Sequence, residues 1–158
     1  MKLYLVQHGE AKSETEDPQR PLTERGKEEV QNVARTAKKL GLHPSIVYHS
    51  GKLRAKQTAE ILADSLRRPV EAAQGLNPND DVRGWAERLS REKEDLMVVG
   101  HLPFLQKMTS LLIVGFENAQ PVFFRYGAII CLEQREDKGW GVRWIFTPEM
   151  AIPPSPLC

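Results

Sequence analysis

Three side chains that could bind an anion such as phosphate, or react with it, each follow an apolar segment of the sequence. His8 comes after the run LYLV and before Gly9, His101 comes after the run LMVVG, and Arg54 lies shortly after the run SIVYH. An imidazole can act as a nucleophile, an acid or a base, and a guanidinium offers a fixed fork of N–H donors to a phosphate. A histidine on a turn after a strand can equally be an ordinary surface residue, so the elements around these residues have to be considered.

Strand-like and helix-like segments alternate along most of the chain. Strands are expected at residues 2–6, 45–49 and 95–100, with a short one near residue 70. Helices are expected after Thr23 as N-cap, from near Lys52, around residues 82–89 and from Pro103. In the first of these helices, Gly41 is the expected stop, and the apolar face is formed by Val30, Val33, Ala34, Ala37 and Leu40.

The pattern changes from Pro121 onward. The segments VFFRYGAIICLEQ (122–134) and GVRWIFTP (141–148) are typical of strands, and REDKGW between them is typical of a hairpin turn. The final PEMAIPPSPLC is rich in proline and is expected to lie on the surface or to fray. The sequence thus predicts a single domain over residues 1–158, a three-layer α/β/α sandwich with a mainly parallel central sheet and antiparallel additions near its C-terminus.

This fold class would bring the three candidate residues together. In open α/β sheets, ligands bind outside the carboxyl ends of the parallel strands. The expected strands end at His8, at His49 and Ser50, and at His101, while Arg54 lies one turn into the following helix. The N-termini of the helices beside them add free N–H groups and positive dipole ends. The predicted edge of the sheet therefore has the composition of a phosphate site.

Composition excludes several other classes of protein. Lys and Arg number 22 against 21 Asp and Glu, a formal net charge of +1, which argues against a nucleic-acid binder. The chain is 41% hydrophobic and 27% charged, as in soluble globular proteins. The apolar run 111–116 is too short to span a membrane, and MKLYLV is not a signal peptide. With Cys131 expected in the core and Cys158 at the terminus, we expect a cytoplasmic protein without a disulfide framework.

Other catalytic motifs are missing from the sequence. Gly26-Lys27 and Gly51-Lys52 lack the first glycine of a Walker loop, and there is neither His-Glu-x-x-His nor Gly-x-Ser-x-Gly. Four scattered histidines without cysteine pairs make a zinc site improbable. Of the remaining histidines, His43 is expected to face solvent, while His49 could line the site or pack at the end of its strand.

Four motifs in order resemble the histidine phosphatase superfamily, and within it the small SixA-type phosphohistidine phosphatases. They are QHGEA (7–11), RPLTERG (20–26), LRAKQTA (53–59) and GHLPFL (100–105). The resemblance covers nearly the whole chain and implies a phosphoglycerate-mutase-like fold. It also implies a hydrolase with no metal and no organic cofactor.

The resemblance implies a role for each matching residue. His8 would attack phosphorus and carry a covalent phosphoryl group, which water then removes. Arg54 would hold the phosphoryl oxygens, and His101 would donate to them as charge shifts in the transition state. Arg20 is a further candidate contact. Substrate-binding roles are also implied for Gln7, Gly9 and Ser50. Ser50 fits the second motif together with Gln57 and Thr58, and the three could also position or pack neighbouring groups.

The sequence departs from the family pattern in two motifs. Gln7 stands where the family normally has arginine, so the site keeps an N–H donor but loses a positive charge. We expect Arg20 or a helix N-terminus to compensate. His49 and Gly51 replace the usual small polar residue and proline.

The general acid is the other open position. Family members that cleave phosphate esters use a carboxylate, whereas a protonatable imidazole leaves a P–N bond easily near neutral pH. The candidate acids are Glu10, Asp80 and Asp81, which could equally be a solvated loop charge and N-caps of the third helix.

Three functions are consistent with these observations. The first is a phosphohistidine phosphatase in signal transduction, acting on a phosphohistidine-bearing protein such as a phosphotransfer domain. The second is a phosphomonoesterase for a small phosphorylated molecule. The third is a phosphate- or phosphoprotein-binding module whose catalysis is weakened by Gln7. None of the three calls for nucleic acid or a membrane as partner.

Overall fold

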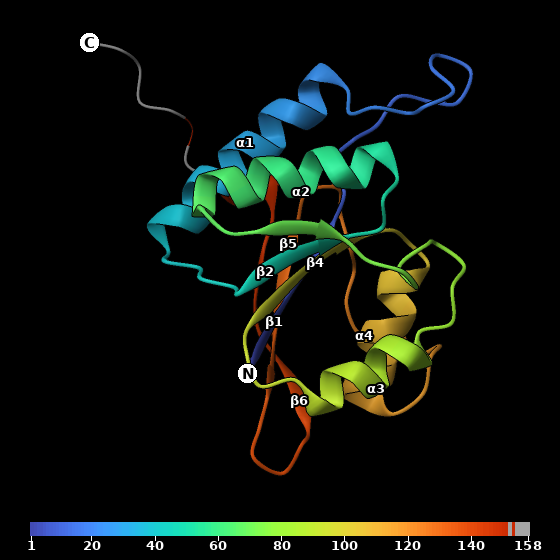
Figure 1. The fold of residues 1–158 in the computed structure, drawn as a ribbon, viewed down its shortest axis with the longest axis vertical. Helices are drawn as coiled ribbons and strands as arrows, with labels where there is room; N and C mark the ends of the chain where they lie inside the picture. Colours follow the sequence, from blue (N-terminus) through green and yellow to red (C-terminus); the bar gives the residue numbers. More distant parts are fainter. Residues whose placement is uncertain (152, 154–158) are drawn as a thin grey trace.

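The computed structural model describes residues 1–151 and 153. A six-stranded sheet forms the centre of this part of the chain (Figure 1). In chain order the elements are β1 (Lys2–Gln7), α1 (Glu24–Lys39), β2 (Ile46–His49), α2 (Leu53–Leu66), β3 (Val70–Ala72), α3 (Arg83–Arg91), β4 (Leu96–Gly100), α4 (Phe104–Val114), β5 (Ile129–Gln134), β6 (Trp140–Phe146) and the 3₁₀ helix η1 (Pro148–Met150). No helix in these residues is long and apolar enough to cross a membrane.

The strand order is β3-β2-β4-β1-β5-β6, and the pairing is mixed. β3, β2, β4 and β1 pair in parallel, whereas β5 pairs antiparallel with β1 and β6 pairs antiparallel with β5. The α/β fold and the antiparallel additions near the C-terminus are confirmed. "Mainly parallel" is a loose description, because two of the five strand pairings are antiparallel.

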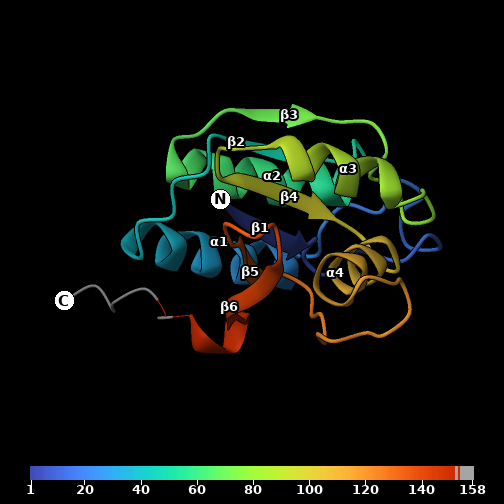
Figure 2. The same cartoon turned by 90° about the horizontal axis from the view of Figure 1, so that it is seen from below.

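Helices cover the sheet on both faces, α1 and α2 on one side and α3 and α4 on the other (Figure 2). β1 shows why, because alternate side chains of a strand point to opposite faces. Tyr4 and Val6 pack into the cluster under α1 and α2, while Leu3 and Leu5 pack into the cluster under α3 and α4. A strand buried on both faces is therefore a continuous apolar run, and so is β4.

Both ends of α1 follow from local signals. Thr23 is the N-cap, and its Oγ1 accepts from the backbone N–H of Gly26 at 2.9 Å. Gly41, with φ +74°, follows the last turn as expected. Leu40 does not belong to the apolar face, because it is the C-cap and its side chain is 59% exposed.

The chain before β5 differs most from expectation. The predicted strand over residues 122–134 begins only at Ile129, so its first seven residues are loop. Gly127 has φ +74°, and its N–H donates to the carbonyl oxygen of Gln7 at 2.9 Å, which ends the loop against β1. The loop lies at the end of the sheet where β1 and β4 finish.

The two cysteines and the C-terminal segment can be placed only in part. Cys131 is buried in the core as expected, and burial raises its pKa to about 11. Pro148–Met150 forms η1. The remainder of the predicted surface segment, including Cys158, lies outside the described residues apart from Ala151 and Pro153.

Candidate active site

His8 and His101 lie side by side at the carboxyl ends of two paired strands. Gln7 of β1 is in register with Gly100 of β4, and the N–H of His8 donates to the carbonyl oxygen of Gly100 at 3.1 Å. The two imidazole centroids are 5.0 Å apart. Residues 93 positions apart in the sequence thus become neighbours through strand pairing, and the charge of Arg54 acts on both of them.

The imidazole of His8 is held as a neutral ring with a defined free nitrogen. Its Nδ1 lies 2.7 Å from the carbonyl oxygen of Gly9, which can only accept, so Nδ1 carries the proton and Nε2 keeps its lone pair. The residue is 6% exposed. Burial, with smaller contributions from the positive charges of Arg54 and Arg20, lowers its pKa to about 4, although the hydrogen bond to the carbonyl oxygen of Gly9 acts in the opposite direction. This is the state that a nucleophilic histidine needs.

Gly9 contacts α1 rather than open space at the site. A Cβ at Gly9 would lie 2.8 Å from Cγ2 of Val30. The N–H of Gly9 donates to Oγ1 of Thr58 at 3.0 Å. Thr58 in turn donates to the carbonyl oxygen of Arg54 at 2.8 Å. Tight packing at Gly9 therefore fixes the backbone that carries His8, and its role in binding substrate stays a prediction.

Arg54 and Arg20 bring positive charge to the two histidines. Nε of Arg54 is buried and has no hydrogen-bond partner within the described part of the chain. Burial, followed by the charge of Arg20, lowers the pKa of Arg54. Arg20 has φ +50° and donates from Nε to the carbonyl oxygen of Lys12 at 3.1 Å. Two guanidiniums close enough to repel each other make a site that favours an anion between them.

His101 is buried more deeply than His8, with 1% of its surface exposed. Burial lowers its pKa to about 3, and protonation of His8 at low pH and the charge of Arg54 act in the same direction. Its Nε2 lies 2.6 Å from Oγ of Ser50, the residue that follows β2. Its Nδ1 is buried without a partner among the described residues.

Gln7 and His49 lie beside the cluster. The side chain of Gln7 is buried, and its Oε1 has no partner in the described chain, so this amide is not committed to another contact there. His49 is also buried, and its Nδ1 accepts from the N–H of Gly51 at 3.0 Å, which supports packing at the end of the strand. His43 is exposed, as expected.

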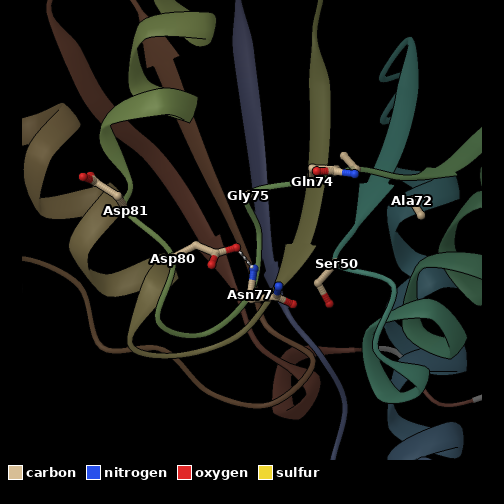
Figure 3. Close-up of a pocket in the computed structure, with 8 residues that line it drawn as sticks. Ser50, Ala72, Gln74, Gly75, Asn77, Asp80 and Asp81 are labelled. Atoms are coloured by element: carbon tan, nitrogen blue, oxygen red, sulfur yellow. Dashed lines mark hydrogen bonds between the residues drawn. The ribbon is translucent and has the colours of Figure 1, made fainter.

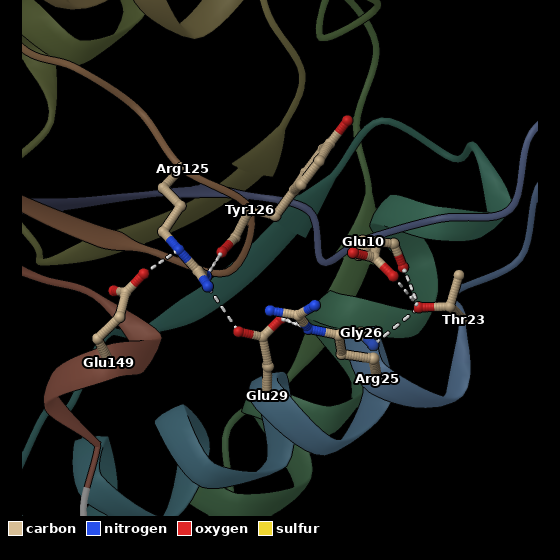
Figure 4. Close-up of polar contacts among 8 residues, drawn as sticks. All are labelled: Glu10, Thr23, Arg25, Gly26, Glu29, Arg125, Tyr126 and Glu149. Carbon is tan, nitrogen blue, oxygen red and sulfur yellow. Dashed lines mark hydrogen bonds and ion pairs between the residues drawn. The ribbon is translucent and has the colours of Figure 1, made fainter.

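The candidate acids all have partners close by in their own segments. The carboxylate of Glu10 accepts from Oγ1 of Thr23 at 2.8 Å, at the start of α1 (Figure 4). Asp80 accepts from the N–H of Asn77 at 2.9 Å. Asp81 accepts from the backbone N–H of Arg83 at 2.9 Å and pairs with its guanidinium, which lowers the pKa of Asp81 to about 2. The N-cap of α3 is Val82, without a side-chain cap hydrogen bond, so the expectation that Asp80 or Asp81 is that N-cap was wrong. The contacts support loop roles over the role of proton donor.

An open pocket of about 730 Å³ adjoins the site on the side of Ser50. Figure 3 shows its walls, which come from the end of β2, the segment after β3 and the loop before α3. It is lined by Ser50, Ala72, Ala73, Gln74, Gly75, Asn77, Asp80 and Asp81. The pocket is polar and open, in contrast to the buried histidines beside it.

Tyr126 is a wall of the site that the sequence did not reveal. Its ring centroid lies 5.5 Å from that of His8, and it is 42% exposed. The turn that carries it is fixed by Arg125, which donates to the carbonyl oxygen of Tyr126 at 2.8 Å and to Glu29 of α1 at 2.7 Å, and also pairs with Glu149 (Figure 4). The sequence signal for this turn is Gly127, which interrupts the apolar run.

Comparison with known proteins identifies the family. The profile of the histidine phosphatase superfamily (branch 1) matches residues 3–80. An uncharacterized protein of Picosynechococcus sp. is 37% identical over 123 residues, which cover 73% of this chain and 74% of that protein. The chain belongs to the histidine phosphatase superfamily. It is thus a phosphatase of that superfamily, and the predicted resemblance is confirmed.

The SixA-type branch of this histidine phosphatase superfamily is supported by two findings. Phosphohistidine phosphatase SixA of Escherichia coli K12 is 28% identical over 155 residues, 94% of each chain. The structure of the protein histidine phosphatase SixA complexed with tungstate superposes with a TM-score of 0.81 at 28% identity, covering 94% of this chain and 97% of that one. A putative alpha-ribazole-5'-P phosphatase from Escherichia coli K-12, at 21% identity and TM-score 0.80, covers 96% and 98% and shares the fold.

Proposed function

We propose that the protein is a phosphohistidine phosphatase that forms a covalent phosphoryl intermediate on Nε2 of His8. The observation that carries this proposal is the buried, neutral imidazole whose Nδ1 proton is bound by the carbonyl oxygen of Gly9. Its free lone pair lies among positive groups that would draw a phosphoryl anion to it. The similarity to SixA over nearly the whole chain supports the same activity.

The reaction has two steps. Nε2 of His8 attacks phosphorus, a new P–N bond forms, and the P–N bond to the substrate histidine breaks. The substrate imidazole takes up a proton from solvent at its other ring nitrogen before the P–N bond breaks, so it leaves as a neutral ring; an imidazole that titrates near pH 6.5 can do this near neutral pH without a strong acid. Water then attacks the phosphoryl group on His8, which frees phosphate and restores the imidazole. Arg54 and His101 stabilise the charge on the phosphoryl oxygens in both steps.

The surroundings of the three carboxylates favour a P–N substrate over an ester. An alkoxide leaving group needs a proton donor, and Glu10, Asp80 and Asp81 each have a partner elsewhere. A phosphohistidine needs none of them. The substrate we propose is a phosphohistidine-bearing protein, such as a phosphotransfer domain in a cytoplasmic signalling system.

A small-molecule phosphomonoesterase is the second candidate. The observation that favours it is the pocket of about 730 Å³ next to Ser50, which has room for a small leaving group. The alpha-ribazole-5'-P phosphatase shares the fold. A binding module without turnover would be the outcome if the loss of arginine at position 7 had removed catalysis.

Turnover of two substrates in parallel separates these candidates. Purified protein is given a phosphohistidine-bearing phosphotransfer domain and p-nitrophenyl phosphate, with His8→Ala and the exposed His43→Ala as matched variants. We expect release of phosphate from the first substrate alone, abolished in His8→Ala and retained in His43→Ala. Turnover of esters alone would support the second candidate, and saturable phosphate binding without turnover the third. An active His8→Ala protein would refute the mechanism.

A further inference from the structure

The contact between Ser50 and His101 links two strand ends across the site. Oγ of Ser50 lies 2.6 Å from Nε2 of His101, so the two side chains are in direct contact. Either atom could donate in such a pair, because a hydroxyl has one proton and two lone pairs and a neutral imidazole has one protonated nitrogen. The direction of this hydrogen bond determines what the other nitrogen of His101 can do.

A second hydrogen bond at Ser50 uses part of the capacity of its hydroxyl group. The backbone N–H of Lys52 donates to Oγ of Ser50 at 3.3 Å, and an amide N–H can only donate. Gly51, with φ +90°, gives the chain the turn between these two residues. One lone pair of Oγ is engaged by Lys52, which leaves the hydroxyl proton and one lone pair for the contact with Nε2, and the proton can point at Nε2.

The ring of His101 can accept that proton because it is neutral. It is 1% exposed, and the positive groups around it, together with burial, keep its pKa well below neutral pH. A neutral ring whose Nε2 accepts must carry its proton on Nδ1. That Nδ1 is buried and has no partner within the described residues.

We propose that Ser50 is a positioning residue that fixes His101 as the Nδ1–H tautomer, so that this N–H is a preset donor to a phosphoryl oxygen. Of the two roles that the sequence allowed for Ser50, this is the positioning role, and it acts through His101. The orientation of the donor rests on the proposed function, but the tautomer itself does not. A donor fixed before the reaction requires no reorganisation when charge develops on the phosphoryl oxygens.

The tautomer can be measured directly in the free protein. The chain has four histidines, so ¹⁵N–¹H spectra of labelled protein at pH 7.5 are simple, and His101→Asn identifies the His101 signals. We expect a protonated Nδ1 and an unprotonated Nε2 in the wild type and in Ser50→Thr. In Ser50→Ala, we expect the Nε2–H form to be populated as well. A wild-type ring protonated at Nε2, or an unchanged tautomer in Ser50→Ala, would overturn the proposal.

Kinetics test the consequence for turnover. Ser50→Ala is expected to lower kcat for a phosphohistidine substrate by about tenfold or more while KM stays within about threefold, and Ser50→Thr to retain most of kcat. Ser65→Ala is the matched control, because Oγ of Ser65 donates to the carbonyl oxygen of Ala34 away from the site. A kcat loss equal in Ser50→Ala and Ser65→Ala would contradict the positioning role. If no substrate is turned over, the proposed function fails, while the spectra still decide the tautomer.

Discussion

The site has an inner side and an outer side that are built in different ways. The inner side consists of His8, Arg54 and His101, which come from strand ends and the first turn of α2, and both of its histidines are buried. The outer side is the open pocket beside Ser50, whose walls come from the segment after β3 and the loop before α3. Its carboxylates are paired within their own loops.

This difference separates the chemistry from the choice of substrate. The inner side provides a neutral nucleophile and positive groups in fixed positions, which any phosphoryl group would use. The outer side provides room and polar walls for whatever the phosphoryl group is attached to. Changes on the inner side should therefore affect every substrate equally, while changes on the outer side should affect substrates differently and less.

The largest effect is expected from Arg54→Lys. Lysine keeps the charge but loses the fork of donors, so kcat/KM should fall by about 10²- to 10³-fold for any substrate that is turned over. Steady-state kinetics on the phosphohistidine protein measure the loss. Arg67→Lys, on the exposed end of α2, is the control and should change little. A loss below tenfold would mean that Arg54 is not the main phosphate contact.

Gly26→Ala should destabilise the support of the inner side. A Cβ at Gly26 would lie 2.2 Å from the carbonyl oxygen of Glu10, a backbone atom that cannot move away without shifting the segment after His8. We expect the free energy of unfolding in urea to fall by about 1–3 kcal/mol or more. Gly84→Ala, in α3 with open space around it, should instead gain up to about 1 kcal/mol. Equal effects of the two substitutions would contradict this packing.

Low pH should destabilise the folded protein through the two histidines of the inner side. In the unfolded chain they bind protons below about pH 6.5, whereas in the folded protein His8 and His101 do so only near pH 4 and pH 3. The unfolded state therefore binds more protons between these limits, and stability falls as pH drops through the window. From pH 6.5 to 5.5 we expect a loss of about 1 kcal/mol for each histidine.

Urea unfolding at several pH values tests this linkage. The variant His8→Asn/His101→Asn has neither titrating ring, so its stability should depend less on pH in this window than that of the wild type. The carboxylates outside the site titrate in both proteins and cancel in the comparison. Parallel curves for the two proteins would show that the histidines are not buried in neutral form.

Gln7→Arg tests whether the inner side already has enough positive charge. Because the charge of Arg20 acts on His8, Arg54 and His101, restoring the usual arginine should raise kcat/KM by less than about tenfold. Steady-state kinetics of the variant with the phosphohistidine protein measure the change. A rise of a hundredfold or more would show that Arg20 does not compensate.

The smallest effect is expected on the outer side, from Asp80→Asn. The amide oxygen can still accept from the N–H of Asn77, so the loop should keep its shape. We expect kcat to stay within about threefold, or roughly 0.6 kcal/mol, for the phosphohistidine protein. A loss of a hundredfold confined to phosphate esters would identify Asp80 as a general acid after all.

The sequence was sufficient for the parts of the molecule that depend on local patterns. The apolar runs of β1 and β4, the N-cap at Thr23 and the stop at Gly41 are each determined by neighbouring residues, and the structure has them as predicted. The meeting of His8 and His101 followed from the rule that parallel strands end at one edge. The positions of the two histidines could therefore be predicted without knowing any individual contact.

Tyr126 could not be predicted because its position depends on distant contacts. The run VFFRY has the composition of a strand, but Arg125 holds it out of the sheet through Glu29, which is 96 residues away, and through Glu149. The packing of Gly9 against α1 could not be predicted for the same reason. Nothing near it in the sequence indicates that Val30 would occupy the space where its Cβ would be.

The direction of β5 has a consequence for how this site can vary. A strand that runs against β1 begins at the edge where β1 ends, so the loop that precedes it, residues 115–128, arrives beside the nucleophile. A parallel strand in that place would have begun at the opposite edge and left this wall missing. Because β5 is antiparallel to β1, one wall of the site is a loop. This loop can change in length or sequence between homologues while β1 and β4 keep both histidines in place.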